Sequence, residues 1–115
     1  MIKERRTNKR INVSLPINYE ILDGNERKCG HTICKDISNE GIKIILDKFY
    51  PNRSKFLIKV NLENMHRVVE SVAESIWSFN ESYSNRYYNG LKFTDINIEN
   101  QKLLKDYVFL RGTSE

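Results

Sequence analysis

The sequence predicts an antiparallel β-barrel, or closed sheet, plugged by one C-terminal α-helix. Short apolar–polar runs follow one another along most of the chain, and turn-forming residues separate them. The apolar period changes to that of a helix only near residue 98. Successive strands joined by turns and followed by a single helix are typical of this architecture.

The first half of the chain contains three predicted strands. Residues 11–21 alternate apolar and polar side chains, and Pro16 marks an edge, a bend or a bulge in this run. An Asp-Gly-Asn turn follows at 23–25. Residues 31–37 and 42–46 are the second and third strands, joined by a short polar segment.

The second half contains three more predicted strands. They are residues 56–62, 67–79 and 87–93. The run 67–79 is long and carries apolar residues on parts of both faces, so we expect it to be bent or bulged. A tight turn at Glu63-Asn64 separates the first two of these strands.

The C-terminal helix is predicted at about 97–111. Asn97 is a suitable N-cap, Glu99 favours the first turn, and Gly112 is expected to end the helix. Its apolar positions follow helical spacing: Ile98, Leu103, Leu104, Tyr107, Val108 and Leu110.

The length and composition fit one globular domain. The chain has 115 residues, of which 39% are hydrophobic and 30% charged. It has no apolar run of about 20 residues to span a bilayer and no secretory signal, so we expect a cytoplasmic protein. Its domains are expected to be a flexible basic N-terminal arm, 1–11, and a single barrel domain with its helix, 12–115.

All of the excess positive charge lies in the arm. The chain has 19 Lys and Arg against 15 Asp and Glu, a net charge of +4. Residues 1–10 hold five of the bases and one acid, which leaves 14 of each sign in the other 105 residues. A duplex-binding surface would spread its bases over a face the size of a groove. A compact anion fits this distribution better.

Two short motifs carry the predicted chemistry. In Arg6-x-x-x-Arg10, each guanidinium presents paired donors that fit a phosphate or the O6/N7 edge of guanine. In Asp36-x-Ser38-x-x-Gly41, the carboxylate can accept the N–H donors of guanine's opposite edge. The motif has an alternative interpretation. Asp and Ser side chains two residues apart at a turn often form hydrogen bonds with their own backbone, and such bonds have no role in ligand binding. The glycine can supply a positive φ.

Together with Tyr88-x-Gly90-Leu91-x-Phe93, Trp77 and the terminal helix, these motifs resemble a PilZ domain. The resemblance covers nearly the whole chain. It implies a six-stranded split barrel with a C-terminal helix, and a bacterial, non-enzymatic receptor for the second messenger cyclic di-GMP. A receptor of this size would pass its signal to a downstream protein partner, as a monomer or a homodimer.

The resemblance also implies the ligand contacts. Trp77 is either one further contact or part of the barrel core, and the motifs leave both open. The expected cyclic di-GMP-binding residues are Arg5, Arg6, Arg10, Asp36, Ser38 and Gly41.

Two other binding functions stay open from the sequence. One is a PilZ-like protein-interaction adaptor with weak or no nucleotide binding. The other is a small barrel that binds single-stranded nucleic acid through exposed aromatic residues, which a neutral barrel disfavours.

Catalysis has little support in the sequence. It contains no nucleophile–base pair, no glycine-rich phosphate loop and no complete set of metal ligands. Cys29 and Cys34 form an incomplete zinc set with His31, and we expect both cysteines to be plain strand residues. No cofactor or metal is expected.

Overall fold

Strand β1 (Ile11–Ile21) shows how the sequence pattern becomes a barrel wall. The computed structural model describes residues 10–22, 28–82 and 84–113. In β1, Leu15, Ile17 and Ile21 are buried, while the polar residues between them face outward. Such alternation fills the interior with apolar side chains and leaves the outer face free for polar ones.

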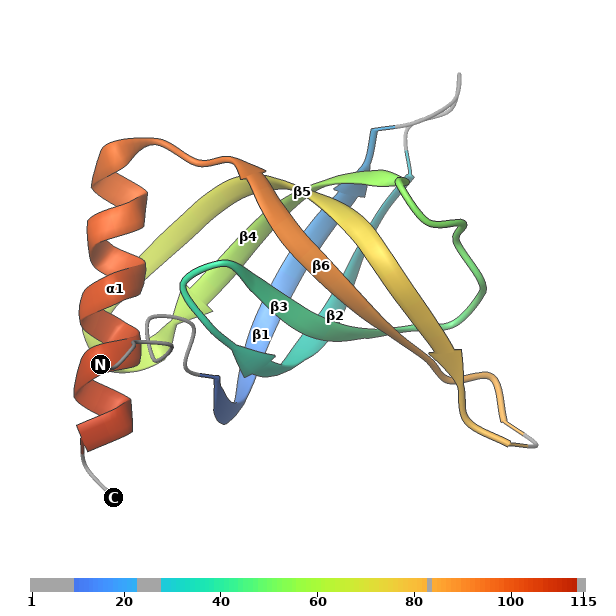
Figure 1. The fold of residues 1–115 in the computed structure, drawn as a ribbon, viewed down its shortest axis with the longest axis horizontal. Coiled ribbons are helices and arrows are strands. Elements are labelled where there is room, and N and C mark those ends of the chain that lie inside the picture. Colours follow the sequence, from blue (N-terminus) through green and yellow to red (C-terminus); the bar gives the residue numbers. More distant parts are fainter. Residues whose placement is uncertain (1–9, 23–27, 83, 114–115) are drawn as a thin grey trace, which may run out of the picture.

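Six antiparallel strands close into a barrel, as predicted (Figure 1). Their order around the barrel is β1-β2-β3-β6-β5-β4, and β4 pairs back onto β1. Closure leaves no open sheet edge. The remaining strands are β2 (Lys28–Ile37), β3 (Gly41–Leu46), β4 (Lys55–Leu62), β5 (Arg67–Asn80) and β6 (Tyr87–Asp95).

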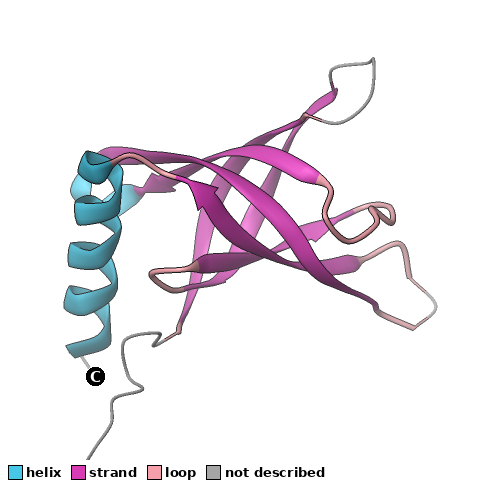
Figure 2. Cartoon of the chain, turned by 45° about the horizontal axis from the view of Figure 1, so that its top comes forward, coloured by secondary structure: helices cyan, strands magenta, loops and turns pink. Residues whose placement is uncertain are grey.

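The single helix, α1 (Ile98–Thr113), lies across one end of the barrel (Figures 1 and 2). Leu104, Tyr107 and Val108 bury its inner face. Asn97 caps it as predicted, because its Oδ1 accepts a 2.8 Å hydrogen bond from the Asn100 N–H. No helix among residues 10–22, 28–82 and 84–113 is long and apolar enough to cross a membrane.

The helix does not end at Gly112, as we expected, but continues to Thr113. Glycine weakens a helix without forcing its end. Arg111 supports the last turn, since its Nη1 donates to the Tyr107 hydroxyl at 3.0 Å.

Two other boundaries differ from the prediction. β2 begins at Lys28 rather than at residue 31, because its first residues pair with the end of β1. Those first residues are mostly exposed, so they lack the alternation of apolar and polar side chains from which we predicted strands. The turn expected at Glu63-Asn64 is a 3-10 helix, η2 (Glu63–Met65). The turn predicted at 23–25 lies outside the described residues.

The long strand β5 is bulged, as predicted. Its pairing with β6 shifts register between Val72 and Ala73 and again between Ser75 and Trp77. The second shift places Ile76 and Trp77 on the outer face, where both are exposed.

Candidate functional site

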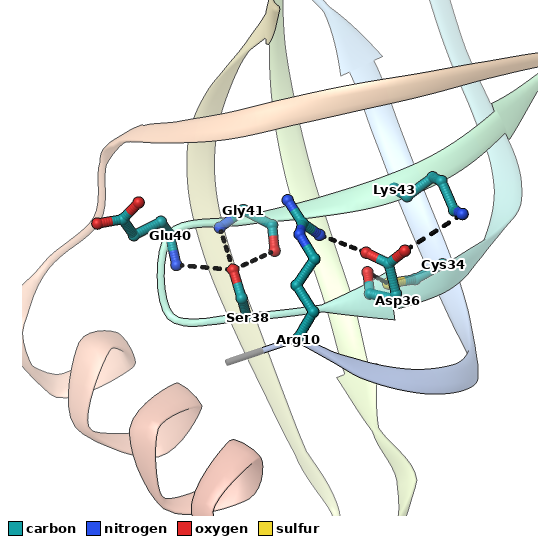
Figure 3. Close-up of polar contacts among 7 residues, drawn as sticks. All are labelled: Arg10, Cys34, Asp36, Ser38, Glu40, Gly41 and Lys43. Atoms are coloured by element: carbon teal, nitrogen blue, oxygen red, sulfur yellow. Dashed lines mark hydrogen bonds and ion pairs between the residues drawn. The ribbon is translucent and has the colours of Figure 1, made fainter. Parts of the chain in front are cut away.

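Strand pairing brings Arg10 to Asp36. Asn12 of β1 lies opposite Asp36 of β2, so Arg10, just before β1, reaches the end of β2. Its Nη1 donates to Oδ1 of Asp36 and forms an ion pair with it (Figure 3). The Arg10 side chain is 46% exposed and that of Asp36 only 12%. Arg10 and Asp36, 26 residues apart, therefore bring the two motifs into contact.

A β-bulge turns Asp36 outward. The register of β2 and β3 shifts between Cys34 and Asp36, while Cys34 and Ile37 both point into the core. As a result, Asp36 lies opposite Lys43 on the outer face of the barrel. The Lys43 Nζ is 3.3 Å from Oδ2 of Asp36.

Sequence reasoning missed Lys43. It lies at an outward position of the strand that follows Gly41, and that alternation was the signal that could have found it. Asp36 therefore makes ion pairs with both of its oxygens, one to Arg10 and one to Lys43.

The thiol of Cys34 fixes the backbone beneath this carboxylate. Its Sγ donates to the Asp36 carbonyl oxygen at 3.1 Å. Burial, together with the negative charge of Asp36, raises the pKa of Cys34 to about 12. Such a thiol stays protonated near neutral pH, so it acts as a structural donor.

Ser38 builds the turn between β2 and β3. Its buried Oγ accepts hydrogen bonds from the N–H groups of Glu40 and Gly41, both at 3.2 Å (Figure 3). Its own N–H donates to the Gly41 carbonyl oxygen at 2.9 Å. Ser38 therefore makes the local bonds that its residue type favours, whereas the Asp36 carboxylate pairs with side chains.

Gly41 is required by a close approach of two strands. Its backbone lies outside the left-handed region, so the positive φ that we considered is not the reason for a glycine. An added Cβ would instead overlap the carbonyl oxygen of Leu91 and lie 3.3 Å from the Cα of Lys92 on β6. The glycine thus keeps the turn close to the barrel wall.

Trp77 lies on the outer face of the barrel and not in its core. Its side chain lies over Gly90, directly opposite on β6, and the residue is 39% exposed. Gly90 in turn lies opposite Lys43, and Lys43 opposite Asp36. Asp36, Lys43, Gly90 and Trp77 therefore form one cross-strand row, which we call the outer row. It spans about 14 Å, or three strand spacings.

Of the predicted contacts, Arg5 and Arg6 lie outside the described residues. The structure brings Arg10 and Asp36 into contact, and it places Trp77 in the same row as Asp36.

Two concavities of about 320 and 340 Å³ both include Tyr19 and His31, and neither includes a predicted site residue. Within the outer row, Asp36 is largely covered by its neighbours, whereas Trp77 is partly exposed.

The arrangement can bind an anion that carries hydrogen-bond donors. Two cationic side chains surround one carboxylate, so the local charge is positive, while the carboxylate supplies acceptor oxygens. Within the part of the chain that the structure describes, no group of His, Cys, Asp and Glu could hold a metal ion.

Comparison with known proteins identifies similar chains. The family model described as "PilZ domain" matches residues 4–110. A search of curated proteins finds no match.

Three solved structures share the fold. The inhibitor of motility MotI (DgrA) of Bacillus subtilis is 23% identical, with a TM-score of 0.78 over 99% of this chain and 53% of its own. The PilZ domain of YcgR from Escherichia coli, solved with c-di-GMP, is 15% identical, with a TM-score of 0.67 over 96% and 94%. The MrkH–c-di-GMP complex of K. pneumonia is 12% identical, with a TM-score of 0.69 over 98% and 56%. This chain spans about half the length of MotI and of MrkH.

Proposed function

The chain belongs to the PilZ domain family, and we propose that it is a non-enzymatic receptor for cyclic di-GMP. The observation that best supports this is the contact between Arg10 and Asp36 on the outer face of the barrel. It joins the two sequence motifs beside a positively charged surface. YcgR and MrkH, which share the fold, were solved with this dinucleotide.

In the proposed complex, Asp36 accepts hydrogen bonds from N1–H and N2–H of one guanine. Arg10 binds a phosphate or the O6/N7 edge of a guanine, both of which suit its planar donors. Ser38 and Gly41 contribute by holding the turn that presents Asp36.

Arg5 and Arg6 supply further contacts to the ligand. They precede Arg10 in the chain by five and four residues, and an extended segment of four residues reaches roughly 13 Å. That reach lets them contact the far side of the ligand. Binding would fix this segment against the barrel and present a new surface to a downstream protein partner.

Trp77 is proposed as a further contact. It lies in the outer row with a partly exposed ring, and an indole can stack on a purine. A cytoplasmic location is part of this proposal.

Calorimetry with cyclic di-GMP tests the proposal at tens of micromolar protein. We expect saturable binding by the wild type and a loss of about 2–4 kcal/mol for R10A and for D36A, typical of truncated charge pairs. K59M is the matched control, because Lys59 is an exposed cation of β4 outside the site.

Two results would contradict the receptor function. One is an absence of heat with the wild type. The other is unchanged affinity in both site variants. Salt-dependent binding to single-stranded oligonucleotides, with no preference for the cyclic dinucleotide, would indicate nucleic-acid binding instead.

A further inference from the structure

Lys43 already contacts one of the two acceptor oxygens that the proposed ligand would use. Its Nζ is 3.3 Å from Oδ2 of Asp36, while Arg10 takes Oδ1. The Asp36 side chain is only 12% exposed, so little solvent reaches either oxygen. The Lys43 side chain is 34% exposed, and its ammonium also lies 5.9 Å from the ring centroid of Tyr88. The ammonium therefore faces the Asp36 carboxylate and the Tyr88 ring at once.

Guanine offers Asp36 two donors on one edge, N1–H and the exocyclic 2-amino group. A carboxylate oxygen has two lone pairs, so Oδ1 can keep Arg10 and also accept N1–H. Oδ2 has the same capacity, so it can accept the 2-amino group beside Lys43. Lys43 and the 2-amino group then share one oxygen, and either of them alone gives that oxygen a partner.

We propose that Lys43 is a counter-ion of Asp36 that tempers the selectivity of the site for the 2-amino group of guanine. In the free protein it neutralises Oδ2. When guanine binds, the 2-amino group shares that oxygen with the ammonium. This inference rests on the proposed binding of cyclic di-GMP at Asp36.

A base without the 2-amino group reveals the role of Lys43. Hypoxanthine keeps N1–H but leaves Oδ2 to Lys43, so the wild type loses little affinity for it. Without Lys43, the same base would leave Oδ2 shielded from water and without a partner, which is unfavourable. Removing Lys43 should therefore increase the preference for guanine over hypoxanthine.

The test compares cyclic di-GMP with cyclic di-inosine monophosphate, by calorimetry, in wild type and K43M. Both ligands carry the same two phosphates, so any general attraction by the Lys43 charge cancels in the ratio of their affinities. We expect this ratio to rise about five- to tenfold in K43M. K43R, which keeps a cation in reach of Asp36, should stay near the wild-type ratio.

K92M is the matched control. Lys92 is an exposed cation of β6 opposite Gly41, in the neighbouring cross-strand row, so K92M loses the same charge on the same face. Its ratio should equal that of the wild type. K43T, with a residue that strands favour, provides a second variant that removes the ammonium. Circular dichroism checks the folding of each.

The outcomes separate the two proposals. A ratio that does not rise in K43M and K43T, or that rises equally in K92M, overturns the role of Lys43 and leaves the receptor function intact. A wild type that binds neither ligand overturns the receptor function, and the role of Lys43 with it.

Discussion

Trp77 lies across Gly90, and the missing side chain of Gly90 makes room for the indole ring. A Cβ added at Gly90 would overlap the ring at Nε1 and Cε2 and lie 2.8 Å from Cδ1. The two residues are directly opposite on β5 and β6. This pair gives a physical reason for the glycine in the Tyr88-x-Gly90 motif and holds the only tryptophan of the chain over the strand that separates it from Lys43.

The first prediction concerns G90A. The new methyl group should push the indole of Trp77 away from the strand, which changes its fluorescence emission and destabilises the fold by about 1–2 kcal/mol. Urea denaturation followed by circular dichroism measures the stability. In a W77A background the same change should have a smaller effect, because no ring then opposes the methyl group. An equal effect in both backgrounds would show that the ring is not the cause.

The second prediction concerns G41A. Here the methyl group would meet the backbone carbonyl of Leu91 and not a side chain that can turn aside. The strands β3 and β6 must separate, so we expect a loss of about 2–4 kcal/mol in the free energy of unfolding. Urea denaturation of G41A and G90A in parallel gives the comparison. A G41A variant as stable as G90A would contradict the close approach of the two strands.

The spacing of apolar residues along the sequence was enough to predict a β-barrel with one C-terminal helix. Alternating runs such as Ile11–Ile21 indicate which face of a strand is buried, and the change to helical spacing near Ile98 indicates the helix. Strand ends were harder to predict, because pairing with β1 and not hydrophobicity decides where β2 begins. The order of strands around the barrel did not follow from periodicity, which is local, whereas closure depends on contacts between distant segments.

The candidate site was predictable in its residues but not in its contacts. The motifs identified Arg10 and Asp36, yet only the register of β1 against β2 brings them together. The bulge that turns Asp36 toward Lys43 leaves no signal in the residue pattern. For the same reason the sequence left the location of Trp77 open, since a bulge reverses the face on which the residues after it lie.

The third prediction concerns the coupling of Arg10 and Asp36 without ligand. The R10A and D36A variants and their double variant form a cycle that isolates the pair. Arg10 is nearly half exposed, so we expect a coupling of only about 0.5–1 kcal/mol, which should fall as salt is added. Urea denaturation at low and high ionic strength measures it. A coupling near zero at low salt would mean that the ion pair does not form in solution.

The last prediction concerns Cys34 and pH. Its pKa is raised from 9.0 to about 12, mainly by burial, so the folded chain holds the thiol proton more tightly than the unfolded chain does. The stability that this provides is complete below about pH 9 and is lost as the pH rises toward 12. Burial also raises the pKa values of Tyr19, Tyr50 and Tyr107, which adds to the loss in the same direction.

C34A isolates the contribution of the thiol. Between pH 8 and pH 10, the free energy of unfolding of the wild type should fall more steeply than that of C34A, whose remaining tyrosines are unchanged. C29A is the matched control, because Cys29 is exposed on the same strand, and it should follow the wild type. Iodoacetamide at pH 8 should correspondingly modify Cys29 quickly in the native protein and Cys34 only after unfolding, since reaction requires an accessible thiolate. Rapid native labelling of Cys34, or equal slopes for wild type and C34A, would show that the thiol is not held in the core beneath Asp36.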